Sequence, residues 1–406
     1  MQGEQSGKAF ERRIKKHIVG PVHRFAVVVP GELSQICLRE VKELGIEGAE
    51  LTDAGVEFEG KVSTAYLCNL RLRTASRILC RLAPFRAGVA EELFYKTADI
   101  PWELWINREI PLHVEAHVEN SRISHEGRVV ELVSEGIERS IKDAPGMDMV
   151  RNNVSGTGAE VSASQDLRQR ILVRLIRNHC RISLDMTGRH LHERGYRLQH
   201  SGAPLRETLA AAILLKMEWN GDTPLVDGMC GSGTFPIEGA MIAGGIAPGQ
   251  GRSFLFERWP SFQAATWRHL RKTAKLPAKE CARTGIWGID IQGEAIRISK
   301  ENAVRAGVGG DIGWKEMDFF DFDPREEKLR NGLLVLNPPY GRRLEGGGGL
   351  FHDKLGDHLR RVYKGWKYAV LSASRAEAGA MKMPLMRLWS FRHGGTLIYA
   401  ALGRVP

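Results

Sequence analysis

The chain has few cysteines and no long apolar run, and both absences limit what it can be. Its 406 residues include six cysteines (37, 68, 80, 180, 230 and 281), and no two form a Cys-x-x-Cys pair. This spacing excludes the usual zinc and thioredoxin motifs, so we expect reduced, buried thiols and no bound metal. No run of eighteen apolar residues occurs, and residues 1–21 lack the apolar core of a secretory signal. We therefore expect a globular cytoplasmic protein without a membrane partner.

Charge is plentiful but unevenly placed. Lysine and arginine outnumber aspartate and glutamate by 58 to 48, which permits a polyanionic partner. Residues 1–21 carry a net charge of +3, residues 22–200 of −1 and residues 201–406 of +8. We interpret residues 1–21 as a disordered basic tail, with an arm that grips nucleic acid as the alternative.

The length suggests two or three domains, and the hydrophobic pattern divides the chain accordingly. Apolar strands and helix-period stretches between residues 22 and 95 predict a small α+β unit, and a second unit follows over residues 96–186. We expect residues 187–203 to form a linker. From 204 to 406 strands and helices alternate, which indicates a largely parallel sheet covered by helices on both faces. The last two strands, joined at His393–Gly395, predict an antiparallel ending.

Lysine is absent between Arg168 and Arg197, where eight arginines occur. Solvated strand edges would explain the cluster, but arginine without lysine also suits bidentate contacts to phosphate. The candidate RNA contacts there are Arg168, Arg170, Arg174, Arg177 and Arg194. A stretch inserted over residues 246–284 mixes aromatic with basic residues, and both a local helical cap and an RNA-binding face remain open for it.

A glycine-rich turn follows the first strand of the alternating region. Asp227 to Thr234 spell Asp-Gly-Met-Cys-Gly-Ser-Gly-Thr between a buried strand and a helix start. An NAD fingerprint would have a different glycine spacing, and a P-loop would need Gly-Lys-Ser/Thr. The carboxylate of Asp227 would repel a pyrophosphate but attract a cationic amino acid, which favours S-adenosylmethionine.

Acids follow the next two strands of the same region. Asp290 ends one strand, where it could accept both hydroxyls of an adenosine ribose, or simply begin the next helix. Asp318 and Phe319 follow another strand, as an acid for the adenine amino group and a ring to cover the base. Asp321 and Asp323 compete with Asp318 for that role.

The sharpest motif is Asn337-Pro338-Pro339-Tyr340, directly after an apolar strand. Asn-Pro-Pro can be a plain turn. However, the Asn337 side-chain oxygen and the Pro338 carbonyl could accept both hydrogens of an amino group and stabilise the charge that grows on nitrogen during methylation. Tyr340 offers a face for stacking an extruded base. No cysteine lies there for pyrimidine C5 methylation, and we expect Cys230 to be a packing residue.

In this order the motifs resemble those of class I amino-group methyltransferases. Together with Leu191–Arg197 and Ala203–Ala212, they resemble the RNA guanine-N2 methyltransferases with an N-terminal THUMP domain, in particular the N-terminal half of the bacterial 23S rRNA enzyme RlmL. The resemblance implies a ferredoxin-like unit plus THUMP domain that binds RNA, then a Rossmann-like S-adenosylmethionine-dependent methyltransferase domain. It implies these cofactor-binding residues: Arg206, Thr208, Leu209, Asp227, Gly228, Cys230, Gly231, Gly233, Thr234, Asp290, Ile291, Asp318, Phe319 and Asn337.

Two departures from the family accompany this resemblance. The family's usual Asp-Pro is Asp227-Gly228 here, which predicts a looser loop and weaker cofactor affinity. The chain also lacks the second methyltransferase module of some relatives, so we expect a single activity. Arg342 and Arg343, after the Asn-Pro-Pro-Tyr motif, are further candidate RNA contacts. Adenine N6, a tRNA guanine, and a non-catalytic RNA-binding assembly factor remain alternatives, and we expect a monomer or weak homodimer.

Overall fold

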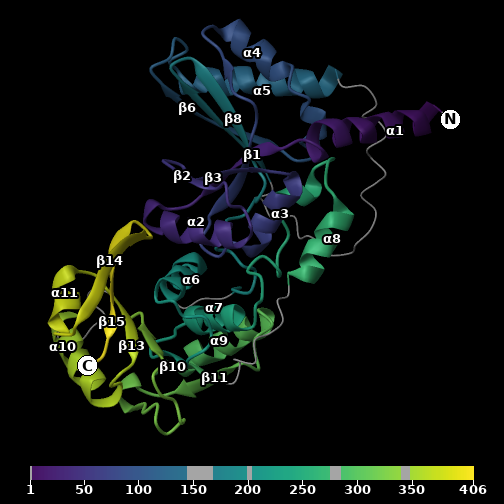
Figure 1. Ribbon diagram of the computed structural model, residues 1–406. Helices are drawn as coiled ribbons and strands as arrows, with labels where there is room; N and C mark the ends of the chain where they lie inside the picture. The colour runs from purple at the N-terminus through teal and green to yellow at the C-terminus, as the bar shows by residue number, and fades with distance from the viewer. Residues whose placement is uncertain (1, 144–167, 199–203, 275–284, 340–347) are drawn as a thin grey trace.

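The computed structural model describes residues 2–143, 168–198, 204–274, 285–339 and 348–406, which build two sheets (Figure 1). The N-terminal sheet has the strand order β2-β3-β1-β4-β8-β7-β6, with β5 paired to β8. The C-terminal sheet has the order β11-β10-β9-β12-β13-β15-β14. Among the described helices, none combines the length and apolar character needed to span a membrane.

The first unit has the strand and helix order of a ferredoxin-like fold. Its elements are β1 (His23–Val28), α2 (Ser34–Glu43), β2 (Glu50–Thr52), β3 (Gly55–Gly60), α3 (Val62–Arg71) and β4 (Arg77–Arg81). β1 pairs antiparallel with both β3 and β4, and β2 pairs antiparallel with β3. All three residues of β2 are exposed, so its sequence carries no hydrophobic alternation. That is why the pattern did not predict this strand.

The second unit extends the same sheet. It contains β5 (Phe85–Arg86), α4 (Ala90–Ala98), β6 (Leu112–Glu119), α5 (Glu126–Asp143), β7 (Gln169–Ile176) and β8 (His179–Asp185). β6 and β7 are parallel, β7 and β8 form a hairpin, and β8 pairs with β4 of the first unit. The hairpin turn lies at Arg177 and Asn178, both with positive φ.

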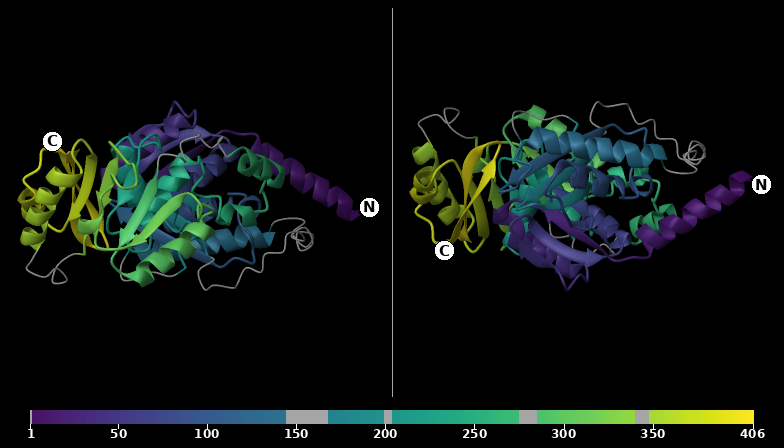
Figure 2. Two further views of the ribbon diagram at one scale, coloured as in Figure 1. Left: turned by 90° about the horizontal axis from the view of Figure 1, so that it is seen from below. Right: turned by 90° about the horizontal axis from the view of Figure 1, so that it is seen from above.

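The predicted disordered tail is wrong. Residues Gln2–Ile14 form α1, and Lys15–Val19 form a π-helical turn. Ile18 is fully buried and Ile14 nearly so, while Phe10 packs against the same core. These three residues are four apart, so they share one helix face and bury it. The Arg13 guanidinium also pairs with the buried carboxylate of Glu103. Figure 2 shows α1 leaving the body of the molecule toward the N-terminus.

The C-terminal sheet confirms the predicted alternation. Five strands run parallel: β9 (Leu225–Asp227), β10 (Ile286–Asp290), β11 (Ile312–Glu316), β12 (Leu333–Leu336) and β13 (Lys367–Ser372). The hairpin β14 (Leu385–His393) and β15 (Thr396–Arg404) ends it, with β15 antiparallel to β13. Strand order reverses between β9 and β12, and ligands of such sheets bind outside the carboxyl ends of the strands at this point.

Helices cover both faces of this sheet, and the sheet separates two apolar cores. α6 (Glu207–Lys216), α7 (Thr234–Ala243) and α9 (Gly293–Arg305) contribute to the larger core, which continues into the N-terminal units. α10 (Gly348–Val362) and α11 (Arg375–Ala380) contribute to the smaller one. Successive strand residues alternate between the cores: Leu333 lies in the larger and Leu334 in the smaller. This burial on both faces explains the continuous apolar strands in the sequence.

The inserted stretch after α7 joins the two halves of the molecule. It contains a 3-10 turn (Leu255–Arg258) and α8 (Ala264–Thr273), which lies beside α3 (Figure 1). Phe256 stacks on Tyr66 with ring centroids 4.2 Å apart, and the indole N–H of Trp259 donates to Gln169 on β7 at 2.8 Å. The aromatic residues of the stretch are therefore interface core. Its basic residues Arg268 and Lys272 are exposed.

Candidate active site

A tight loop connects β9 to α7 at the reversal point of the sheet. Gly231 and Gly233 have φ of +53° and +82°, a region that residues with a side chain rarely adopt. Helix α9 holds the loop: the Ser299 hydroxyl donates to the Gly231 carbonyl at 2.7 Å, and the Asn302 amide donates to the Ser232 carbonyl at 3.0 Å. The loop is thus rigid before any ligand arrives, so binding loses little conformational entropy.

Asp227 lies at the end of β9, with only 1% of its surface exposed. Burial raises the pKa of its carboxyl well above the ordinary value, and the nearby Asp290 charge raises it further. A backbone N–H from Met229 reaches it at 3.2 Å. A carboxylate in this environment is stabilised by a cation, so the site suits the positively charged amino-acid end of S-adenosylmethionine. Cys230 is 6% exposed, and burial raises the pKa of its thiol, so it is no ready nucleophile.

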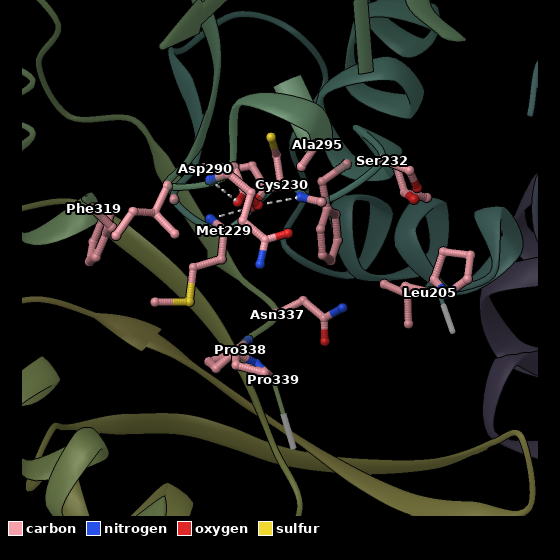
Figure 3. Close-up of a pocket in the computed structure, with 18 of the residues that line it drawn as sticks. Leu205, Met229, Cys230, Ser232, Asp290, Ala295, Phe319, Asn337, Pro338 and Pro339 are labelled. Carbon is pink, nitrogen blue, oxygen red and sulfur yellow. Dashed lines mark hydrogen bonds between the residues drawn. The ribbon is translucent and has the colours of Figure 1, made fainter. Parts of the chain in front are cut away.

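Asp290 ends the neighbouring strand β10 and is fixed by two backbone donors (Figure 3). One carboxylate oxygen accepts from the Gly231 N–H at 2.9 Å, and the other accepts from the Gln292 N–H at 3.0 Å. Each oxygen can accept more than one hydrogen. The carboxylate therefore faces the loop in a fixed orientation and can still accept the two hydroxyls of a ribose.

Asp318 and Phe319 follow β11 on the far side of Asp290. The Asp318 carboxylate accepts from the Phe320 N–H at 3.0 Å. Phe319 is almost fully buried and lies close against Gly228. Both residues line the same cavity as Asp290, whereas Asp321 and Asp323 do not. Asp323 instead pairs with Arg325. The geometry thus favours Asp318 among the three acids.

The Asn-Pro-Pro motif meets the glycine loop because β12 pairs directly with β9. Asn337 and Pro338 come just past the end of β12, and Asn337 is half-buried. Figure 3 shows Asn337 between Met229 of the loop and Pro338–Pro339, with Phe319 and Leu205 toward opposite ends of the view. Tyr340, Arg342 and Arg343 lie outside the described residues.

These elements enclose one cavity of about 720 Å³, within the size range of cofactor sites. Twelve predicted residues line it: Asp227, Gly228, Cys230, Gly231, Thr234, Asp290, Ile291, Asp318, Phe319, Asn337, Pro338 and Pro339. Four predicted cofactor residues do not: Gly233, Arg206, Thr208 and Leu209. Thr208 and Leu209 are buried in α6. These lining residues were not predicted from the sequence: Pro204, Leu205, Met229, Ser232, Phe235, Gln292, Ala295, Phe320 and Phe351. Most of them adjoin a predicted residue, which was the available signal.

The predicted RNA-binding arginines have different environments. Arg168, Arg174 and Arg177 are exposed, while Arg170 is half-buried and pairs with Glu115 at 2.9 Å. Arg194 was wrongly predicted to contact RNA, because it is 3% exposed and pairs with the buried Glu238 of α7 at 3.3 Å. A buried guanidinium needs such a partner, and this one ties the linker to the catalytic domain.

A doubly wound sheet whose glycine loop, strand-end acids and Asn-Pro-Pro motif share one cavity defines a class I methyltransferase. Residues 194–392 match the family model described as RMKL-like, methyltransferase domain, and residues 24–79 match the RlmL ferredoxin-like domain. The chain is 35% identical over 358 residues to "Putative RNA methyltransferase slr0064" of Synechocystis sp., which covers 87% of this chain and 88% of that protein. The chain belongs to this RMKL-like methyltransferase family.

Other relatives agree with this assignment. "Ribosomal RNA large subunit methyltransferase K/L" of Psychromonas ingrahamii is 33% identical over 87% of this chain, which spans only 46% of that protein. A solved structure described as "SMU.472, a putative methyltransferase complexed with SAH" has a TM-score of 0.77 and 26% identity, covering 95% of this chain and 98% of the other. A "predicted N6-adenine-specific DNA methylase" from Listeria monocytogenes has a TM-score of 0.76 and 29% identity over 94% and 97%. The fold and cofactor are therefore those of an S-adenosylmethionine-dependent methyltransferase.

Proposed function

We propose that the protein transfers a methyl group from S-adenosylmethionine to the exocyclic N2 amino group of a guanine in RNA, with 23S rRNA as the substrate and the cytoplasm as the location. The observation that carries the proposal is the meeting of Asn337-Pro338-Pro339 with Asp227 and Asp290 in one cavity. The names of the relatives that act on RNA support the choice of substrate.

The chain supplies position and polarity rather than a strong base. S-adenosylmethionine supplies a methyl group bound to a positively charged sulfur. Asp227 would hold its ammonium group and Asp290 its ribose, which directs the methyl toward the end of β12. There the Asn337 side-chain oxygen and the Pro338 carbonyl would accept the two hydrogens of the guanine amino group. Both acceptors stabilise the positive charge that develops on nitrogen, and the proton leaves afterwards.

Three alternative functions remain. Adenine N6 methylation uses the same pair of acceptors, and a relative of similar fold bears a name of that kind. A non-catalytic RNA-binding factor is disfavoured by the intact Asp227, Asp290 and Asn337, which line one cavity. A tRNA guanine substrate would engage the site identically and differs only in the RNA presented.

The test is transfer of an isotope-labelled methyl group to rRNA purified from a strain that lacks the gene. Labelled N2-methylguanosine after nuclease digestion supports the proposal, and label in N6-methyladenosine would replace it with the alternative. The Asn337→Ala variant should lose transfer by about 10²–10³-fold, the cost of removing one preorganised polar group. Its affinity for S-adenosylmethionine, measured by calorimetry, should stay near wild type. Asn337→Ala activity equal to wild type would refute the role assigned to Asn337.

A further inference from the structure

Two more cavities lie in series beside the cofactor cavity, and the methyl-transfer chemistry uses neither. The first, here called the arginine cavity, has a volume of about 730 Å³ and lies between the linker, residues 251–253 and the β14–β15 turn. It shares Pro204 with the cofactor cavity. The second, the edge cavity, has about 310 Å³ and lies beside the starts of β6 and β7. It shares Arg189 and Glu193 with the arginine cavity. The three cavities form a continuous series from the N-terminal sheet to the methyl-transfer site.

Arginine is the most frequent charged residue in the lining of the arginine and edge cavities. The arginine and edge cavities together are lined by eight arginines, three acidic residues and no lysine. Five of the eight pair with a carboxylate, among them Arg77 with Asp185 and Arg197 with Glu207. Within the described residues, Arg168, Arg206 and Arg252 have no carboxylate partner. The lining therefore holds an excess of positive charge that internal ion pairs leave uncompensated.

These three arginines differ in how free they are to bind a ligand. Arg252 donates to the carbonyls of His190, Glu193 and Arg189, so it holds the linker while keeping its charge. Arg168 and Arg206 are exposed and make no ion pair within the described part of the chain. Burial, reinforced by Arg206, lowers the pKa of His192 to about 3, which agrees with a strongly cationic cavity. The cavity therefore favours an anion.

We propose that the arginine and edge cavities bind phosphates of the RNA strand beside the target nucleotide, with Arg206 and Arg168 as the contacting residues. This inference rests on the proposed function for the identity of the polymer. Arginine presents a planar fork of donors that matches phosphate oxygens, and such contacts position a nucleic acid without reading its sequence. An enzyme that modifies a base must take it out of the stack, and phosphates held on one side of the target fix the extruded strand. Arg206 thus serves RNA rather than the cofactor, to which the family resemblance assigns it.

The experiment compares Arg206→Ala and Arg168→Ala with Arg404→Ala. Arg404 is exposed and pairs in register with Lys367 at the start of β13, so it lies at the sheet edge opposite the site. Binding of a short fluorescein-labelled single-stranded RNA is measured by anisotropy over a salt series, and S-adenosylmethionine affinity by calorimetry. Arg206→Ala and Arg168→Ala should each weaken RNA binding about tenfold and reduce the salt slope by about 0.7. Cofactor affinity should not change, and Arg404→Ala should match wild type throughout.

Several outcomes would overturn the inference or separate it from the proposed function. If Arg206→Ala loses cofactor affinity while RNA binding is unchanged, Arg206 binds the cofactor and the inference is wrong for this residue. Unchanged RNA binding and salt slope in both variants, in an enzyme that still methylates RNA, would refute the inference alone. If wild type methylates no RNA but binds it in an Arg206-dependent way, the proposed function fails and the phosphate site stands. Arg206→Lys should keep the salt slope and bind with intermediate affinity, because it keeps the charge but not the fork.

Discussion

Replacing Gly228 by alanine tests how closely Phe319 packs against the glycine loop of the cofactor site. A β-carbon at this position would lie 2.2 Å from the Cδ2 atom of Phe319 and 2.7 Å from that of Leu336. Real contacts of this kind stay above 3.0 Å, so the Phe319 ring would have to move by about 1 Å. The ring of Phe319 thus occupies the space that a side chain at 228 would need. Weaker cofactor binding from a looser Gly228 loop stays a prediction.

The cost of Gly228→Ala follows from overpacking a buried site, about 1–3 kcal/mol. In a domain of this size that corresponds to a fall of about 2–12 °C in Tm. Because Phe319 lines the cofactor cavity, displacement of the ring should also weaken S-adenosylmethionine binding. A loss of about 1 kcal/mol from the binding free energy would raise the Kd about fivefold.

Thermal unfolding and calorimetry with S-adenosylmethionine measure the two effects. Gly310→Ala is the matched control, because a β-carbon there meets nothing within 4 Å. Adding Phe319→Leu to Gly228→Ala should recover part of the lost stability, since the shorter side chain frees the space, and the double-mutant cycle measures this coupling. A Gly228→Ala protein with wild-type Tm and cofactor affinity would show that Phe319 does not pack against Gly228 in solution.

Three further predictions concern charge and the N-terminus. Burial raises the pKa of Asp227, so between its unfolded and its raised folded pKa the folded protein binds more protons than the unfolded chain, and this group lowers stability as the pH rises past its unfolded value. Asp227→Asn should therefore raise Tm at pH 8 yet weaken cofactor binding, and calorimetry in two buffers should show proton release on binding only in wild type. Ile18→Ala should lower Tm by several degrees, since Ile18 is fully buried. An unchanged Tm would instead support the prediction of a disordered N-terminal tail. Replacing Arg174 and Arg177 together by alanine should weaken RNA binding and flatten its salt dependence, and an unchanged slope would leave both as ordinary surface residues.

The catalytic domain was the more predictable half, for physical reasons. Its central strands β9, β10, β12 and β13 are largely buried, so each is a short apolar run, and the functional side chains follow where such runs end. Asp227, Asp290 and Asn337 therefore met at one edge as expected. The short exposed strand β2 gave no such signal.

The errors in the sequence analysis concern residues whose environment depends on distant parts of the chain. Nothing near Arg194 indicates that it pairs with Glu238, which lies 44 residues away and is itself buried. Thr208 and Leu209 follow Arg206 in sequence and are buried in α6 without lining the cofactor cavity, so their role toward the cofactor stays a prediction. The basic composition of residues 1–21 predicts a disordered tail, whereas Ile14 and Ile18 lie on one face of the first helical segments and are buried.

Nucleoside mass spectrometry of rRNA tests the central claim most directly. The 23S rRNA is compared between wild-type cells, cells that lack the gene, and deletion cells that carry either the wild-type gene or Asn337→Ala. We predict that one N2-methylguanosine disappears in the deletion strain, returns with the wild-type gene and stays absent with Asn337→Ala. Unchanged N2-methylguanosine in the deletion strain, with loss of a different methylated nucleoside, would contradict guanine N2 as the target.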